Sequence, residues 1–339
     1  MSPFDRILMG HGAGGRMTAE LVRELFLEHI GNEYLEPLDD AAVLPPLPPG
    51  RPALTTDAFV VSPALFPGGN LGHLAVTGTV NDLSMSGARP LWITWGVILE
   101  EGVEAALVET CVRGAAEAAE TAGVRLVAGD TKVVPRGAGD GIYAVTAGLG
   151  IVPPGRELGD TRLRPGDAIV LTGTLGDHGA AIMAARHGLG AGELLSDCAP
   201  LAAMIEALWE GGVHPRSMHD PTRGGLATVA VEVAVRSGLR MELDEPAIPV
   251  RRETRAVCEI LGLDPLYLAC EGRAVLWIAP DELEPCLDLL RQHPLGKEAA
   301  VIGQVGDAFG AGSPVVLRTR SGGLRPLDML SGAGLPRIC

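Results

Sequence analysis

The run Pro153-Pro154-Gly155 divides this chain of 339 residues into two parts. Adjacent prolines fix φ and remove backbone N–H donors, so neither a helix nor a central strand passes through them. A chain of this length also exceeds the usual size of one domain. Both parts contain short apolar runs typical of strands and longer helical patterns. We therefore expect an α/β protein with two mixed domains, each burying its own core.

The hydrophobic periodicity predicts individual elements in both parts. In the first part, we expect helices at residues 17–30, 74–80 and 103–121 and strands at residues 92–99, 125–128 and 142–151. In the second part, we expect strands at residues 168–172, 240–243, 274–278, 301–305 and 315–318 and helices at residues 179–186, 200–209 and 225–237.

Charge and composition exclude several classes of partner. Hydrophobic residues make up 47% of the chain and charged residues 20%, which is typical of a globular protein. A formal net charge of -15 argues against nucleic acid or an anionic membrane as a partner. No apolar run reaches membrane-spanning length, and the first residues do not resemble a secretory signal, so we expect a cytoplasmic protein. The six cysteines show no metal-ligand spacing and are expected to be five buried thiols and the terminal Cys339.

A glycine-rich run, Gly10-His11-Gly12-Ala13-Gly14-Gly15, precedes the first expected helix. It formally satisfies the dinucleotide pattern G-x-G-x-x-G, but only the short run Arg6-Ile7-Leu8-Met9 is available as a leading strand. Pro37 also follows where a second parallel strand would begin. We favour a glycine-rich strap that closes over a phosphate ligand, and a plain helix N-terminus is the alternative.

Acidic residues follow apolar segments at four places in the first part, namely at Asp39 and Asp40, at Asp57, at Asp82 and at Asp130. A single carboxylate at such a position is usually a cap or turn residue. Four groups at the ends of elements in one domain can converge, and a cation is what usually holds carboxylates together. Oxygen ligands without His or Cys suit Mg²⁺, which commonly bridges nucleotide phosphates. The chain has no P-loop motif, so any nucleotide site is of another kind.

Two polar motifs stand out in the second part. The run from His219 to Gly225 opens an expected helix, where backbone amides and Arg223 can hold an anion. The run Ala269-Cys270-Glu271-Gly272-Arg273 places an ion-capable pair beside a glycine at the start of a strand. For either motif alone, a capping or salt-bridge role is the commoner explanation.

The sequence ends in Pro336-Arg337-Ile338-Cys339. A thiol at this position has no chain after it, and residues 331–334 lack bulky side chains, so we expect a flexible tail that presents Cys339. A frayed terminus that happens to end in Cys is the alternative.

Motifs spread over nearly the whole chain form one set: Gly12-Ala13-Gly14-Gly15, Asp39-Asp40-Ala41, Thr56-Asp57, Phe66-Pro67-Gly68-Gly69, Gly78-Thr79-Val80-Asn81-Asp82-Leu83, Ala128-Gly129-Asp130-Thr131-Lys132, His219-Asp220-Pro221-Thr222-Arg223-Gly224-Gly225 and the terminal Pro-Arg-Ile-Cys. Together they resemble the HypE-type hydrogenase maturation proteins, in the PurM-like superfamily of aminoimidazole ribonucleotide synthetase. The terminal motif is the narrowest of the set. One departure is Ala269-Cys270 before Glu271, where Asn is expected more often.

This resemblance implies an ATP-dependent dehydration of a carbamoyl group carried on Cys339, which yields a thiocyanate and thus the cyanide ligand for the iron of a [NiFe]-hydrogenase. It implies Lys132 and Glu271 as further catalytic residues, on either side of the carbamoylated sulfur. The implied nucleotide contacts are Gly12, Gly14, Gly15, Asn81, Thr131, Asp220 and Arg223. The implied Mg²⁺ ligands are Asp39, Asp40, Asp57, Asp82 and Asp130.

The resemblance also implies a PurM-like two-domain fold. The expected parts are a strap and helix at residues 1–40, an ATP-binding domain at 41–152, a C-terminal domain at 153–320 and a flexible tail at 321–339. The N-terminal domain is expected to pair across a homodimer so that two sheets close a β-barrel. The implied partners are a HypF-type carbamoyltransferase and a HypC-HypD-type iron scaffold.

Three rival functions are compatible with parts of this pattern. A selenophosphate synthetase would need a reactive Cys or selenocysteine in the glycine-rich strap, where this chain has His11 and neither of these residues. A purine-pathway synthetase has no use for a terminal thiol. The third is a non-catalytic carrier, in which Cys339 is only a modification site and the acidic residues are structural.

Overall fold

The computed structural model describes residues 4–190, 192–330, 335 and 337–339. The expectations for residues 331–334 and for Pro336 lie outside this range. The chain divides into two compact units: a first unit of residues 1–83, 88–154 and 339, and a second unit of residues 84–87 and 155–338. Each is described by itself. Among the described residues, no helix combines the length and apolar character needed to cross a membrane.

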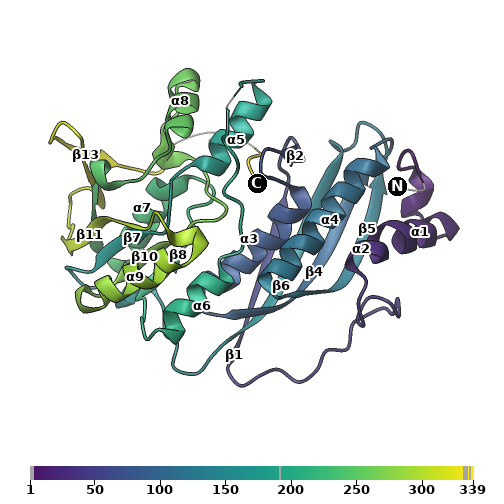
Figure 1. Cartoon of the computed structure of the whole chain (residues 1–339), viewed down its shortest axis with the longest axis horizontal. Coiled ribbons are helices and arrows are strands. Elements are labelled where there is room, and N and C mark those ends of the chain that lie inside the picture. Colours follow the sequence, from purple (N-terminus) through teal and green to yellow (C-terminus); the bar gives the residue numbers. More distant parts are fainter. Residues whose placement is uncertain (1–3, 191, 331–334, 336) are drawn as a thin grey trace. The chain divides into compact units, whose positions relative to one another are not determined.

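The first unit contains a four-stranded sheet in the order β1-β6-β4-β5, covered on one face by helices α3 and α4 (Figure 1). Only the β4–β5 pair is parallel. The sheet strands are β1 (Arg51–Phe59), β4 (Arg89–Glu100), β5 (Arg125–Val134) and β6 (Ile142–Val152), the helices are α3 (Leu71–Met85) and α4 (Ala105–Ala122), and a small hairpin is formed by β2 (Leu65–Phe66) and β3 (Gly69–Asn70).

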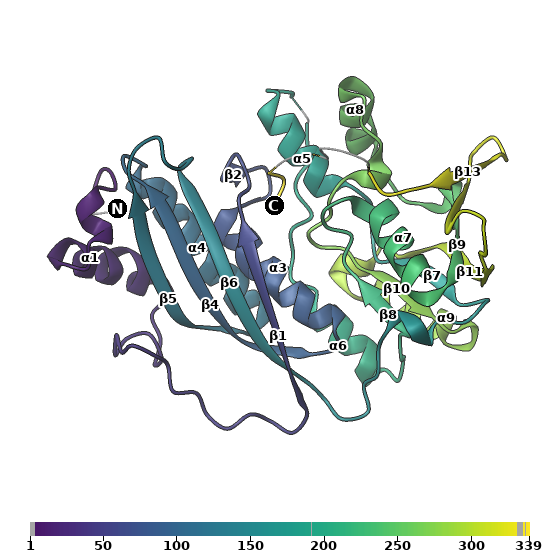
Figure 2. The same cartoon turned by 180° about the vertical axis from the view of Figure 1, so that it is seen from behind.

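The two faces of this sheet differ because side chains alternate along each strand. Residues such as Trp95 and Val97 point toward the helices and are buried. On the other face, which Figure 2 presents in front of α3 and α4, Leu54 is 77% exposed and Val145 is 41% exposed. The first unit therefore leaves apolar side chains of its sheet in contact with solvent.

The N-terminal helical segment packs beside β5. It comprises η1 (Met9–Gly12), α1 (Arg16–Leu21), the π-helical η2 (Val22–Leu27) and α2 (Glu28–Ile30), which confirms the predicted helix at residues 17–30. A side chain at Gly12 would place its Cβ only 2.6 Å from the backbone N of Val133. Gly12 thus allows the glycine-rich run to lie close against β5. The sheet of this unit is mixed, not doubly wound and parallel, so the dinucleotide reading is excluded.

The second unit is built on a seven-stranded sheet in the order β13-β12-β9-β11-β7-β10-β8. Along β7 and β10, alternate residues enter two separate cores: Ile169 and Trp277 pack with α7, whereas Val170 and Leu276 pack with α6 and α9. The strands are β7 (Ala168–Leu171), β8 (Ser217–His219), β9 (Leu239–Asp244), β10 (Val275–Ile278), β11 (Ala300–Ala308), β12 (Val315–Arg318) and β13 (Leu324–Leu327). The helices are α5 (Asp177–Arg186), α6 (Ala202–Glu210), α7 (Gly225–Ser237), α8 (Arg252–Leu261), α9 (Leu283–Gln292) and the short η3 (Asp160–Arg162), η4 (Glu245–Ala247), η5 (Pro265–Tyr267), η6 (Pro280–Glu282) and η7 (Pro294–Gly296).

Three placements of acidic residues at the ends of elements were wrong. Asp57 lies inside β1, Asp82 lies inside α3 and Asp130 lies inside β5. Polar residues usually mark turns, but here threonine hydroxyls and a lysine satisfy the carboxylates within regular structure. Helices α8 and α9 and strands β8 and β13 were not anticipated, and β13 falls within the segment assigned to the tail.

Candidate active site

Two of the predicted metal ligands lie side by side where α3 packs on β1. Thr55 Oγ1 donates a hydrogen bond to Asp82 Oδ2 at 2.8 Å, and Thr79 Oγ1 lies 3.3 Å from Asp57 Oδ2. Thr55 and Asp57 are two residues apart on one strand face, and Thr79 and Asp82 are three residues apart on one helix face, so the four side chains form one cluster. Burial raises the pKa of Asp82, although the Thr55 hydroxyl partly offsets this effect.

Asp130 lies on the opposite face of the same sheet. Its carboxylate accepts hydrogen bonds of 2.6 and 2.7 Å from Lys132 Nζ and one of 2.8 Å from the backbone N of Thr131. The side chains of Lys132 and Asp130 are 63% and 67% exposed. An ion pair this exposed contributes at most about 1 kcal/mol to stability, so the Lys132 ammonium can leave Asp130 at little energetic cost.

The five predicted Mg²⁺ ligands are therefore divided within the chain. Asp57 and Asp82 share one cluster, Asp130 lies on the other sheet face, and Asp39 and Asp40 are exposed in the segment between α2 and β1. In the part of the chain that the structure describes, no three His, Cys, Asp or Glu side chains come together as a metal site. The oxygen donors of the Asp57 and Asp82 cluster nevertheless suit a hard cation such as Mg²⁺.

The predicted nucleotide contacts are also spread over both units. In the first unit, Asn81 is buried in α3 and Thr131 is partly exposed in β5. In the second unit, Asp220 and Arg223 lie between β8 and α7, with the Arg223 side chain exposed. Gly225, the first residue of α7, has φ of 62°, and a Cβ there would lie 2.6 Å from the carbonyl oxygen of Leu266. Glycine is thus required at this helix start.

Glu271 is held in a buried loop of the second unit and is 2% exposed. Its backbone N–H donates a hydrogen bond to Asp197 Oδ1 at 3.0 Å. The next residue, Gly272, packs so closely that a Cβ would lie 1.8 Å from the carbonyl oxygen of Asp197. Arg273 Nε donates to the carbonyl oxygen of Thr174 and lies 3.8 Å from Asp197 Oδ2. The backbone at Glu271 is thereby fixed from both sides.

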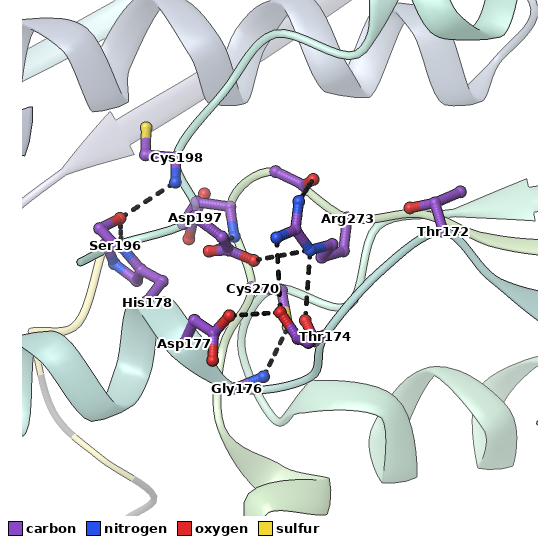
Figure 3. A network of polar contacts seen from close by, with 12 residues as sticks. Thr172, Thr174, Gly176, Asp177, His178, Ser196, Asp197, Cys198, Cys270 and Arg273 are labelled. Carbon is purple, nitrogen blue, oxygen red and sulfur yellow. Dashed lines mark hydrogen bonds and ion pairs between the residues drawn. The ribbon is translucent and has the colours of Figure 1, made fainter. Parts of the chain in front are cut away.

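A buried polar network around this loop was missed by the sequence analysis (Figure 3). Asp177, at the start of α5, is 1% exposed, accepts a hydrogen bond of 2.6 Å from Thr254 Oγ1 and lies 3.1 Å from Arg251 Nε. Burial raises the pKa of Asp197 to about 6, although Arg273 opposes this. The residues of the network come from distant segments of the chain, so no local pattern could have indicated them.

The cysteines follow the prediction. Cys111, Cys198, Cys258, Cys270 and Cys286 are buried, whereas Cys339 is half-buried. The backbone N of Val60 donates a hydrogen bond of 3.2 Å to the carbonyl oxygen of Cys339. Cys270, at the position where Asn was expected more often, accepts a hydrogen bond from the backbone N of Gly176 at 3.0 Å, and burial raises the pKa of its thiol. Cys339 is thus the accessible thiol among the described cysteines.

Comparison with known proteins places the chain in a family. Residues 38–152 match the family "AIR synthase related protein, N-terminal domain", and residues 164–313 match "AIR synthase related protein, C-terminal domain". The carbamoyl dehydratase HypE of Azotobacter vinelandii is 47% identical over 332 residues, which cover 98% of this chain and 96% of that protein. The carbamoyl dehydratase HypE of Escherichia coli is 42% identical over 342 residues, which cover 99% of this chain and all of that protein.

Solved structures agree with these relatives. The structure of hydrogenase maturation protein HypE in complex with ATP has a TM-score of 0.93 and 44% identity, and covers 98% of this chain and 99% of that chain. A HypE-HypF complex has a TM-score of 0.78 and 41% identity, and covers 91% of this chain and 99% of that chain. A thiamine-monophosphate kinase from Stenotrophomonas maltophilia, 21% identical with a TM-score of 0.65, shares the fold alone.

These relatives confirm the predicted two-domain PurM-like fold of mixed α/β type. They also exclude the selenophosphate and purine-pathway synthetases as the family of this chain, since the similarity to HypE extends over nearly its full length. The chain belongs to the HypE family of carbamoyl dehydratases, which act in the maturation of hydrogenases.

Proposed function

We propose that this protein uses ATP to dehydrate a carbamoyl group carried on the thiol of its own Cys339. The product is a thiocyanate, which supplies the cyanide ligand for the iron of a [NiFe]-hydrogenase. The accessibility of Cys339 carries the proposal, because this thiol is only half-buried, whereas the other five cysteines are buried and poorly placed to accept a group from a partner enzyme.

The chemistry requires ATP because the oxygen of a carboxamide is a poor leaving group. Transfer of a phosphoryl group from ATP to that oxygen releases ADP and, with loss of one proton from the nitrogen to a base, gives an imidate phosphate. Loss of phosphate and of the second proton then forms the carbon–nitrogen triple bond, so that the oxygen leaves in phosphate. Phosphoryl transfer depends mainly on positioning and on neutralising charge.

We assign orientation of the amide and handling of its protons to Lys132 and Glu271. Lys132 carries a positive charge and is suited to steady the carbamoyl oxygen or the phosphate placed on it. Glu271 is suited to accept the protons from the nitrogen, because its backbone is held by Asp197 and its side chain is 2% exposed.

We assign Mg²⁺ binding to the acidic residues of the first unit. The cluster of Asp57, Asp82 and their threonine neighbours offers closely spaced oxygen donors, and Asp39, Asp40 and Asp130 are the further candidates. Mg²⁺ would reduce the negative charge of the ATP phosphates. Nucleotide contacts are assigned to Gly12, Gly14, Gly15, Asn81, Thr131, Asp220 and Arg223. A related HypE has been solved in complex with ATP, which supports ATP as the nucleotide here.

The proposal includes a homodimer in which the exposed faces of two first-unit sheets close a β-barrel. Leu54 and Val145 support it, because they leave apolar surface on that face that a second copy would cover. We also propose that a flexible tail carries Cys339. The expected location of the protein is the cytoplasm.

The partners follow from the chemistry. A HypF-type carbamoyltransferase would load Cys339, and a HypC-HypD-type iron scaffold would accept the cyanide. A related HypE has been solved in complex with HypF, which supports the first of these partners.

The mass of the C-terminal peptide tests the proposal. After incubation with the carbamoyl donor system and ATP, the peptide should first gain the mass of a carbamoyl group and then lose the mass of water. Cys339→Ala should fold and bind ATP but gain no mass. A non-catalytic carrier would keep the carbamoyl group and never lose water, and a carbamoylated tail in Cys339→Ala would disprove the assignment of the acceptor.

A further inference from the structure

The last residues of the chain are bound to helix α5 through a buried histidine. His178, in the first turn of α5, is 0% exposed. Its Nε2 lies 2.9 Å from the carbonyl oxygen of Ile338, and its Nδ1 lies 2.8 Å from Ser196 Oγ. Ser196 Oγ also accepts a hydrogen bond of 3.1 Å from the backbone N of Cys198.

This arrangement requires a proton on one particular ring nitrogen of His178. A carbonyl oxygen only accepts hydrogen bonds, so Nε2 must carry a proton and donate it to Ile338. With a neutral ring, Nδ1 is then an acceptor and Ser196 must donate to it. The Ser196 hydroxyl can donate a hydrogen bond to His178 Nδ1 while it accepts one from the backbone N of Cys198. Each of the three hydrogen bonds in this series therefore has one donor and one acceptor. A neutral imidazole also avoids repulsion with the nearby guanidinium of Arg186.

Other contacts bind the same segment to α5. Ile338 is 3% exposed, and Leu335 packs against the apolar cluster that includes Ala181 and Ala184 of α5. Arg186, the last residue of α5, donates a hydrogen bond to the carbonyl oxygen of Arg337. The φ of Arg337 is 56°, a conformation that residues other than glycine seldom adopt unless contacts hold them there. Both ends of α5 therefore contact the main chain of the tail.

The segment that carries Ser196 also holds the backbone of Glu271. The residue after Ser196 is Asp197, whose Oδ1 accepts the backbone N–H of Glu271. A single short segment thus contacts the tail through His178 on one side and the candidate proton acceptor on the other.

We propose that His178 and Ser196 form a docking site for the main chain of the tail, and that residues 196–197 set its position relative to Glu271. His178 is a positioning residue here, because it holds the residue next to Cys339 and takes no part in the proton transfers. The inference deepens the proposed function, since the position of the tail matters for dehydration only if Cys339 carries the reacting group.

Alkylation of Cys339 tests docking without ATP or a carbamoyl donor. The full-length protein is treated with iodoacetamide, and the modified C-terminal peptide is followed by mass spectrometry. Loss of a buried hydrogen bond shifts such an equilibrium by about tenfold, so His178→Ala should speed alkylation by about that factor. Ser196→Ala, a smaller change, should speed it in the same direction. His178→Gln retains an N–H donor at the end of the side chain and should return the rate toward that of the parent.

His187→Ala is the matched control, because His187 lies just after α5 and is exposed. It should alkylate at the parent rate. If Cys339 is also alkylated at the parent rate in His178→Ala and in Ser196→Ala, the proposed docking of the tail on these two residues is wrong. Should His178→Ala fail to fold, Ser196→Ala decides the question alone, since it removes only one oxygen atom.

A second measurement tests the effect on the reaction. With Cys339 carbamoylated beforehand, the single-turnover rate of dehydration should fall about tenfold in His178→Ala and recover in His178→Gln. A parent dehydration rate in His178→Ala, together with faster alkylation, would overturn the positioning role. If the parent protein itself never dehydrates its tail, the proposed function fails, whereas the alkylation result still decides whether the tail docks on His178.

Discussion

The buried carboxylate of Asp197 accepts the backbone N–H of Glu271 at 3.0 Å, so the main chain of the candidate proton acceptor is fixed by a neighbour 74 residues away in the sequence. Gly272 reinforces this contact, because any larger residue would collide with the carbonyl oxygen of Asp197. The side chain of Glu271 is therefore presented from a rigid loop, as efficient proton transfer requires.

Glu271→Gln should bind ATP and accept the carbamoyl group but stall before the nitrile forms. Gln has nearly the same shape but cannot accept the protons, and loss of a general base typically slows a reaction by about a hundred- to ten-thousand-fold. Single-turnover assays on the carbamoylated protein measure this step. If thiocyanate forms at the parent rate, Glu271 is not the base.

Lys132→Ala should fail at or before phosphorylation while its stability changes by at most about 1 kcal/mol, because its pair with Asp130 is exposed. The measurements are release of ADP in a single turnover and the free energy of unfolding. Lys297→Ala, at an exposed lysine of the second unit, is the control and should react as the parent does. If Lys132→Ala released ADP at the parent rate, Lys132 would have no role in phosphorylation and would only form a surface ion pair with Asp130.

Asp82→Asn should weaken binding of Mg²⁺-ATP without loss of stability. Burial disfavours the charged form of Asp82 and raises its pKa in the folded state, so its contribution to stability is lost as the pH rises through that pKa. An asparagine at this position removes the charge, and its side-chain oxygen can still accept the hydrogen bond from the Thr55 hydroxyl. Calorimetry should show weaker binding in Asp57→Asn and Asp130→Asn as well. Unchanged affinity in all three variants would make the carboxylates structural.

His178 and Asp197 should give opposite dependences of stability on pH. Burial lowers the pKa of His178 from 6.5 to about 4, so its contribution is present above pH 6.5 and is lost as the pH falls toward 4. Burial raises the pKa of Asp197 from 3.8 to about 6, so its contribution is present below pH 3.8 and is lost as the pH rises through 6. Each pKa shift corresponds to a change of about 3 kcal/mol in the free energy of unfolding. Because the two changes have opposite signs over the same pH range, they largely cancel in the parent protein.

Single variants should separate these two effects. Relative to the parent, His178→Gln should gain stability as the pH falls from 6.5 to 4, and Asp197→Asn should lose stability over the same interval. Denaturant unfolding across this pH range measures both. Parallel profiles for the parent and the two variants would contradict the assignment.

The sequence was sufficient for the family, the two mixed domains and the accessible thiol. The glycine, aspartate and terminal motifs are local in the chain, and strands such as β4 and helices such as α4 have clear periodicity. The separation of Cys339 from five buried cysteines also followed from composition, because scattered thiols without ligand spacing usually belong to a core.

Only the tertiary structure decided how the acidic and catalytic residues are grouped. Asp57 and Asp130 look alike in sequence, but strand register places them on opposite faces of one sheet, since a shift of one residue reverses the direction of a side chain. The contacts of Asp197 with Glu271 and of His178 with Ile338 span 74 and 160 residues. Such contacts form only when separate elements pack together, and no local pattern encodes which distant residue will be the partner.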